Sequence, residues 1–457
     1  MAFIDVKELP VHRLTARVRA RIKPWLAGEH RLTQRMAGTA FVIRIASAAI
    51  VFSSQILLAR WMGDSEFGTY VYAWTWLMLV GEIVHLGMPL TAQRFIPEYT
   101  QAGAFNMLRG YLAGSRWITF AIGTLAALVG ALIVRAVESS LESHMIMPFY
   151  LVCVALPFYS LTFMFDGMAR SYDWINIALL PPYIVRPLLI VIGVAIARSA
   201  GFALNATTVT AALAAATWLS ALAQLLMLER RLGIVVPRGR KTYDARLWLS
   251  TALPIVLVWG MYTLLTSTDI IVLKIFRPPQ EVAHYYAAAK TLALVGIVQY
   301  AVAAASAHRF TGYHVAGDRA GLAAFAADTV RWVFWPSFVG CLAMLLLGKP
   351  VLSLFGAGFR DGYPVIVLLA VGQLARACVG PAERLLNMLG EQRSCAFAYA
   401  AAFAVNVLGC FLLAPAFGTI GVASATAAAF VVESGLLFLI ARRRLGLHML
   451  IWRRAKY

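Results

Sequence analysis

Long apolar segments recur along the whole chain and are separated by short polar connections. Each is close to the roughly 20 helical residues that cross about 30 Å of hydrocarbon. We expect twelve spans, at residues 37–59, 68–89, 115–135, 145–165, 175–197, 203–227, 248–268, 284–306, 329–348, 364–388, 394–414 and 418–440. This pattern predicts an all-α, polytopic membrane protein.

The connection between the sixth and seventh spans divides the chain into two halves. It covers residues 229–246, is rich in arginine and contains Pro237 and Gly239. We therefore expect a six-helix bundle at residues 36–228, this basic linker, and a second six-helix bundle at residues 247–441. Because six is even, both bundles enter the membrane from the same side, which predicts a pseudo-two-fold axis along the membrane normal.

A short polar elbow follows the first span and returns in the second half of the chain. The elbow contains Arg60, Glu66, Gly68 and Tyr70. About 214 residues later, a looser copy with a one-residue insertion has Lys274, Glu281, Ala283 and Tyr285. A repeated segment of this kind indicates that the two bundles share one plan, and we interpret the elbow as a structural hinge at the outer surface.

Composition and charge place the protein in a membrane. The chain is 61% apolar and 13% charged, and its mean hydropathy is +0.75, which excludes an ordinary soluble protein. The net charge of +19 is concentrated in the segments between spans on one side, so it indicates topology rather than nucleic-acid binding. This asymmetry predicts that both termini are cytoplasmic.

Both ends of the chain are basic. Residues 1–35 could form an amphipathic helix on the anionic inner leaflet, or they could be a solvated cytoplasmic tail. Residues 442–457 form a second basic tail. The five cysteines lie inside apolar spans without the spacing of metal ligands, so we expect neither disulfides nor a metal site.

Four cations are predicted to lie inside the membrane, where a charge is costly and therefore suggests a function. We expect them to line a cavity between the bundles and to bind an anionic group, since arginine donates bidentate hydrogen bonds to phosphate. They are Arg44, Arg186, Lys290 and Arg376.

The alternative for these cations is internal pairing. Arg44 could pair with Glu82, and Lys290 with Asp269. Arg186 and Arg376 have no acid at a matching depth in a neighbouring span, so they are the stronger candidates for substrate binding. Arg186 also lies among Pro181, Pro182 and Pro187, and broken helices near the midplane often mark transporter sites.

Three further residues are candidates for binding a coupling ion. Glu82 and His85 share one helical face and could bind a proton or a cation, or could be a hydrogen-bonded packing pair. Asp269 lies near the outer end of its span. The sequence contains no Gly-x-x-x-x-Gly-Lys-Ser/Thr loop and no sizeable soluble domain, so we expect no cofactor.

The twelve spans in two halves, combined with three short motifs, resemble the polysaccharide transporter family of Wzx-type flippases. These motifs are Ala59-Arg60-Trp61-Met62-Gly63, Glu66-Phe67-Gly68-Thr69-Tyr70 and Leu86-Gly87-Met88. The family belongs to the multidrug, oligosaccharidyl-lipid and polysaccharide exporter (MOP) superfamily, which also holds the multidrug/toxin extruders and the lipid II flippases.

The resemblance implies a function, a location and partners. The expected function is translocation of an undecaprenyl-diphosphate-linked oligosaccharide across the bacterial inner membrane, by alternating access through a cationic cavity. The product would serve O-antigen, capsule or exopolysaccharide synthesis. Expected partners are the lipid-linked oligosaccharide, membrane lipids, a polysaccharide polymerase and chain-length proteins.

Two other functions fit parts of the pattern. A drug/cation antiporter of the multidrug and toxin extrusion type should have an acid-dominated cavity, whereas deep cations outnumber central acids here. A membrane-embedded glycan polymerase or ligase should have a large outer loop or paired outer acids. Only Glu138 and Glu142 form such a pair, so we expect a transporter and not an enzyme.

Overall fold

The computed structural model describes residue 39 and residues 42–451. The amphipathic helix predicted within residues 1–35 and the end of the basic tail lie outside the described residues. The described part is helical and contains no β-strand. It has nine helices that are long and apolar enough to cross a membrane, or ten if the bent pair α11 and α12 forms one span.

The first half of the chain forms a bundle in which several spans are broken. Its elements are the helix Val42–Met62, α2 (Asp64–Val84), α3 (Met88–Gln101), α4 (Phe105–Ala136), η1 (Glu138–Ser140), α5 (Ser143–Ser171), α6 (Ile175–Leu180), η2 (Pro181–Val185), α7 (Arg186–Ser199) and α8 (Ala206–Val235). The break between α2 and α3 falls at Gly87, whose φ of 71° is a left-handed conformation that favours glycine.

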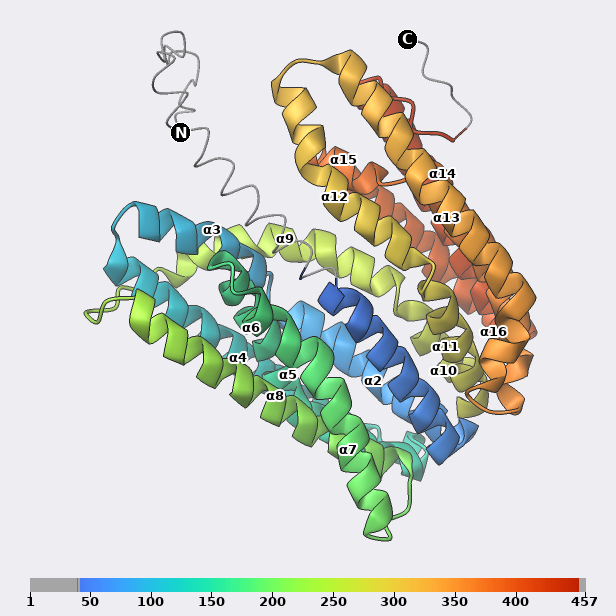
Figure 1. The fold of residues 1–457 in the computed structure, drawn as a ribbon. Helices are drawn as coiled ribbons and strands as arrows, with labels where there is room; N and C mark the ends of the chain where they lie inside the picture. The colour runs from blue at the N-terminus through green and yellow to red at the C-terminus, as the bar shows by residue number, and fades with distance from the viewer. Residues whose placement is uncertain (1–38, 40–41, 452–457) are drawn as a thin grey trace, which may run out of the picture.

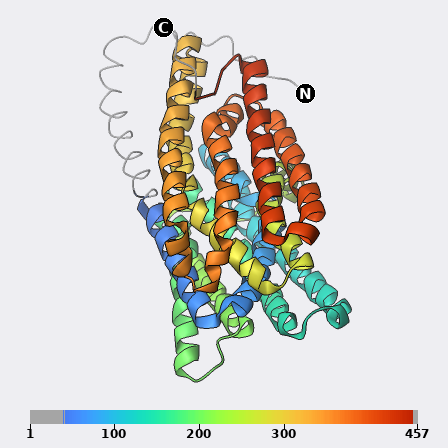
Figure 2. The same ribbon diagram turned by 90° about the vertical axis from the view of Figure 1, so that its right-hand side faces the viewer.

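The second half forms the other bundle. Its elements are α9 (Ala245–Leu265), α10 (Thr268–Phe276), α11 (Pro279–Ala293), α12 (Gly296–Val315), α13 (Arg319–Ser353), η3 (Gly358–Gly362), α14 (Tyr363–Val379), α15 (Ala382–Met388) and α16 (Gln392–Leu445). Figure 2 shows the long helices of this half running side by side, and α14 packs against both α13 and α16.

The longest helix, α16, is two spans joined by a sharp reversal. Its 54 residues include Gly418, whose φ of 54° and ψ of −130° are not helical. Beyond this point the chain packs back on itself, because Asn406 Nδ2 donates to Thr426 Oγ1 at 3.1 Å. The two arms of α16 therefore occupy the predicted spans 394–414 and 418–440.

The two bundles meet around α2, α10 and α11 and spread apart toward α3 and α15 (Figure 1). At the meeting point, a Cβ atom on Gly68 of α2 would overlap the carbonyl group of Pro279 at the start of α11. Phe67 is fully buried, and its ring lies 6.1 Å from that of Tyr286 and 6.0 Å from that of Phe359. The predicted elbow and its copy are thus the segments that hold the bundles together.

The two glutamates of the repeat occupy corresponding positions. Glu66 Oε2 accepts a hydrogen bond of 2.7 Å from the backbone N–H of Ala206, at the start of the first bundle's last helix. Glu281 lies beside Gly418, where the second bundle's last span begins: a Cβ there would be 2.7 Å from Glu281 Oε2. These equivalent contacts support a common plan for the two bundles.

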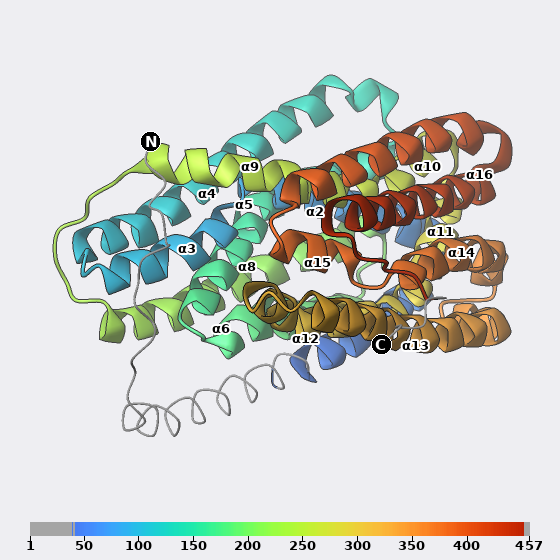
Figure 3. The same ribbon diagram turned by 90° about the horizontal axis from the view of Figure 1, so that it is seen from above.

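The connection between the bundles is fixed to the first one. Residues 229–235 continue α8, and α9 begins at Ala245, so the non-helical segment is shorter than the predicted linker. Arg109 of α4 donates to the carbonyl oxygens of Pro237 and Arg240 at 2.7 and 2.8 Å. Trp248 is fully buried and donates to Tyr99 at 3.1 Å. Seen from above, α9 runs from this bundle toward α10 (Figure 3).

The close approach at Gly68 leads to a stability prediction. We expect Gly68→Ala to lower the free energy of unfolding by about 1–3 kcal/mol, because the added methyl group must displace the backbone of Pro279. The measurement is thermal unfolding of the purified protein in detergent. The matched control is Gly435→Ala in α16, where a Cβ meets nothing within 4 Å. Equal melting temperatures for the two variants would contradict the tight contact.

Candidate functional site

Arg186 lies between prolines on a broken span. Residues Pro181–Val185 form a π-helical turn between α6 and α7 that contains Pro181 and Pro182. Arg186 is the first residue of α7, and Pro187 follows it. Prolines remove backbone donors, so carbonyl groups before them lose their helical partners, which is costly in hydrocarbon. Gln224 of α8 replaces one such partner by donating to the carbonyl of Ile177 at 3.0 Å, four residues before Pro181. Ser220 donates at 2.7 Å to the carbonyl of Pro181, which also accepts from the backbone N–H of Arg186 in the π-helical turn. The broken span is therefore a stable support for Arg186.

The side chain of Arg186 lies among aromatic rings. Its guanidinium carbon is 4.9 Å from the ring centre of Tyr159 and 5.6 Å from that of Trp74. The residue is only 9% exposed, and its buried Nη1 has no hydrogen-bond partner. None of the ion pairs among the described residues includes Arg186. A buried cation with an unused donor is suited to an anionic ligand.

Two more of the predicted cations also lie on aromatic rings. Arg44 lies 4.1 Å from the ring centre of Tyr183 in the first bundle and 5.8 Å from that of Tyr300 in the second. Arg44 acts electrostatically on Asp166, which pairs with Arg170 at 3.0 Å.

Lys290 Nζ is 5.1 Å from the ring centre of Tyr286, and the acid that acts on it is the predicted Asp269. Tyr286 belongs to the contact between the bundles, because its ring meets that of Phe67. Arg186, Arg44 and Lys290 therefore all lie against aromatic rings, and they come from both halves of the chain.

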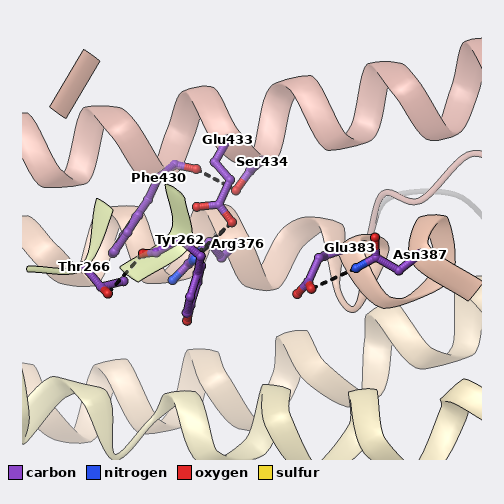
Figure 4. Close-up of polar contacts among 8 residues, drawn as sticks. All are labelled: Tyr262, Thr266, Arg376, Glu383, Asn387, Phe430, Glu433 and Ser434. Carbon is purple, nitrogen blue, oxygen red and sulfur yellow. Dashed lines mark hydrogen bonds and ion pairs between the residues drawn. The ribbon is translucent and has the colours of Figure 1, made fainter. Parts of the chain in front are cut away.

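Arg376 differs from these three because it has an acid partner. Its Nη2 and Nε lie 3.0 and 3.2 Å from Glu433 Oε1, and its guanidinium is 4.1 Å from the ring centre of Phe430. Figure 4 shows Arg376 and Glu433 pointing toward one another. The expectation that Arg376 has no acid at its depth is wrong. The acid is on the last span, and only the packing of α14 against α16 brings the two together.

Arg376 and Glu433 line a cavity of about 190 Å³ inside the second bundle. Its wall includes Tyr262, Gln299, Tyr300, Gln373, Arg376, Glu383, Arg384, Tyr399, Glu433 and Ser434. Three buried polar atoms of this wall have no hydrogen-bond partner, namely Gln373 Nε2, Arg384 Nε and Glu433 Oε2. The sequence does not predict this cavity, because its residues come from five helices that are distant in the chain.

The coupling-ion candidates are each engaged within the protein. His85 Nδ1 accepts from the backbone N–H of Gly87 at 3.1 Å, and His85 Nε2 lies 3.6 Å from Glu82. The hydrogen bond from Gly87 closes the turn between α2 and α3. Asp269 Oδ2 accepts a hydrogen bond of 2.7 Å from Tyr285. In the described part of the chain, no group of three His, Cys, Asp or Glu residues could hold a metal ion.

The pair of acids considered for catalysis is separated into two ion pairs. Glu138 is 2.6 Å from Arg135, and Glu142 is 3.1 Å from Lys274. Each of the two carboxylates therefore has its own cationic partner in the described structure.

Comparison with known proteins identifies the fold. No protein-family model and no curated protein matches the sequence. Among solved structures, the lipid II flippase MurJ in an inward closed conformation has a TM-score of 0.72 and 14% identity, covering 88% of this chain and 87% of its own.

Two further structures share the fold. An inward-facing multidrug resistance MATE transporter of the MOP superfamily has a TM-score of 0.73 and 14% identity, covering 89% of this chain and 98% of its own. A MOP superfamily transporter from Pyrococcus furiosus, described by the reverse polarity of its binding pocket, has a TM-score of 0.64 and 14% identity over 90% and 95% of the two chains. The chain is thus an all-helical membrane protein with the two-bundle fold of MOP superfamily transporters and flippases.

Proposed function

We propose that the protein is a flippase that moves an undecaprenyl-diphosphate-linked oligosaccharide across the bacterial inner membrane by alternating access. The observation that carries this proposal is Arg186, a buried cation with an unused donor and no ion pair in the described structure. A diphosphate supplies both the negative charge and the acceptor oxygens that such a guanidinium lacks.

Two other cations that lie against aromatic rings, Arg44 and Lys290, place positive charge near both bundles. Arg44 lies between Tyr183, three residues before Arg186, and Tyr300 of the second bundle. Lys290 is next to Tyr286 at the contact between the bundles. An anion bound among these residues would contact both bundles, so its binding would be sensitive to how they move relative to each other.

The proposed membrane topology determines which side of the membrane the open end of the two bundles faces. With both termini cytoplasmic, the elbow contacts lie toward the periplasm and the bundles spread apart toward the cytoplasm (Figure 1). This is the conformation that would receive a lipid-linked glycan from the side on which it is made. On the outer side, the product would pass to a polymerase and chain-length proteins for O-antigen, capsule or exopolysaccharide synthesis.

A drug/cation antiporter is the second candidate, because the MATE transporters share this fold. A cationic cargo requires a carboxylate that is free to pair with it. The deep carboxylates here already have partners: Glu433 pairs with Arg376, and Asp269 accepts from Tyr285. Arg186, by contrast, forms none of the ion pairs among the described residues and has an unused donor, which favours an anionic cargo.

The proposal predicts a defect in cells. Deletion of the gene should cause a lipid-linked oligosaccharide to accumulate on the cytoplasmic leaflet, and the wild-type gene should restore export. Arg186→Ala should lower export about tenfold or more, because it removes a charge-assisted contact to the diphosphate. The matched control is Arg94→Ala, which removes an exposed arginine of α3. No accumulation in the deletion strain would contradict the flippase, and full complementation by Arg186→Ala would contradict the anion site.

The two arginines should differ in their effect on stability. Removing one partner of the buried Arg376–Glu433 pair leaves an unpaired charge, so Arg376→Ala should destabilise the protein by about 3–5 kcal/mol. The double variant Arg376→Leu with Glu433→Leu should recover most of this loss. Arg186→Ala should destabilise much less, since it breaks no ion pair.

Thermal unfolding of the purified variants in detergent measures these differences. A double variant whose loss is the sum of the two single losses would show that Arg376 and Glu433 do not act as a pair.

A further inference from the structure

The cavity of the second bundle has the features of a binding site that lacks its ligand. Glu433 is 3% exposed and Gln373 is 9% exposed, yet Glu433 Oε2 and Gln373 Nε2 have no hydrogen-bond partner. Arg384 Nε on the same wall also lacks a partner. Buried polar atoms are normally satisfied, so these three atoms indicate that something else bonds to them. Glu433 Oε2 is an acceptor, and the other two are donors.

The charges of the wall identify the chemical class of that ligand. The wall contains two arginines, Arg376 and Arg384, and two glutamates, Glu383 and Glu433, so its formal charges cancel. The guanidinium of Arg376 already lies 3.0 Å from Glu433, which disfavours a metal cation at that carboxylate. The ligand should therefore be neutral and should both donate and accept hydrogen bonds.

The aromatic residues of the wall and the cavity volume further limit which neutral ligand could bind. The rings of Tyr262 and Tyr399 meet edge to face with their centres 5.6 Å apart and make an aromatic part of the wall beside the Arg376–Glu433 pair (Figure 4 shows Tyr262 there). A sugar ring has an apolar face and a rim of hydroxyl groups that donate and accept. The volume of about 190 Å³ is below the roughly 300–1,000 Å³ of sites for drug-sized ligands, which suits one small group.

We infer that this cavity binds one neutral sugar unit of the lipid-linked glycan, with a sugar hydroxyl donating to Glu433 Oε2 and another accepting from Gln373 Nε2. The inference rests on the proposed flippase function. Arg44 connects the two regions, because its guanidinium lies against Tyr183, close in sequence to Arg186, and against Tyr300 of the cavity wall. A diphosphate near Arg186 and Arg44 thus leaves its attached sugar beside the cavity.

The test is the affinity of the purified full-length protein for two lipids, measured by native mass spectrometry in detergent. The probes are undecaprenyl diphosphate and undecaprenyl diphosphate that carries one N-acetylglucosamine. The wild type should bind the sugar-bearing lipid about tenfold more tightly, the ratio expected from one or two net hydrogen bonds. Arg186→Ala should weaken binding of both lipids by the same factor.

The decisive variant is Gln373→Leu, which breaks no hydrogen bond of Nε2 in the protein and leaves the Arg376–Glu433 pair in place. It should reduce the preference for the sugar-bearing lipid to less than twofold and leave the affinity for undecaprenyl diphosphate unchanged. Glu433→Gln should do the same if it folds. The matched controls are Gln101→Leu and Glu98→Gln on exposed positions of α3, which should keep the full preference.

The outcomes separate the two proposals. Equal binding of the two lipids by the wild type, or an undiminished preference in Gln373→Leu, would overturn the sugar site while the flippase function stands. If neither lipid binds the wild-type protein, both the flippase function and the sugar site are overturned.

Discussion

The absence of water around a transmembrane helix limits where a charge or a free backbone group can be. In hydrocarbon, each must find a partner within the protein or in a ligand. Most groups of this chain obey that limit internally: Ser220 and Gln224 satisfy carbonyls near the prolines, and Glu433 neutralises Arg376. Arg186 departs from it, since aromatic rings replace the acid and one donor is left unused. Its position on the broken span, rather than its charge alone, makes it a candidate for binding substrate.

The elements that support Arg186 come from three different spans. Trp74 is on α2, Tyr159 is on α5, and the prolines are on its own span. A cation held by ring faces retains most of its positive charge, whereas a carboxylate would cancel it. Arg44 and Lys290 also lie against ring faces, although Asp166 and Asp269 act on them electrostatically, so Arg186 is the cation that depends most on aromatic contacts.

Hydropathy and repeat patterns predict much of the fold, because they depend on residues close together in the chain. The elbow at Gly68 and its copy were identified from sequence, although their direct contact was not. The Arg376–Glu433 pair could not be predicted, since its partners are 57 residues apart on spans whose neighbours the sequence does not specify. Asp166 near Arg44 and the cavity around Gln373 were missed for the same reason. The positions of buried charges are predictable, but their partners depend on the packing of helices.

The two bundles share one plan and yet differ in how their polar groups are balanced. The corresponding contacts of Glu66 and Glu281 show the shared plan where the bundles meet. Deeper in the membrane, the first bundle has a cation without an acid at Arg186, and the second has equal numbers of arginines and glutamates around its cavity. A lipid-linked glycan also has one charged part and one neutral part, namely its diphosphate and the sugar attached to it. A transporter that binds the two parts in different bundles could distinguish a complete substrate from the bare carrier lipid, since only the complete substrate would contact both.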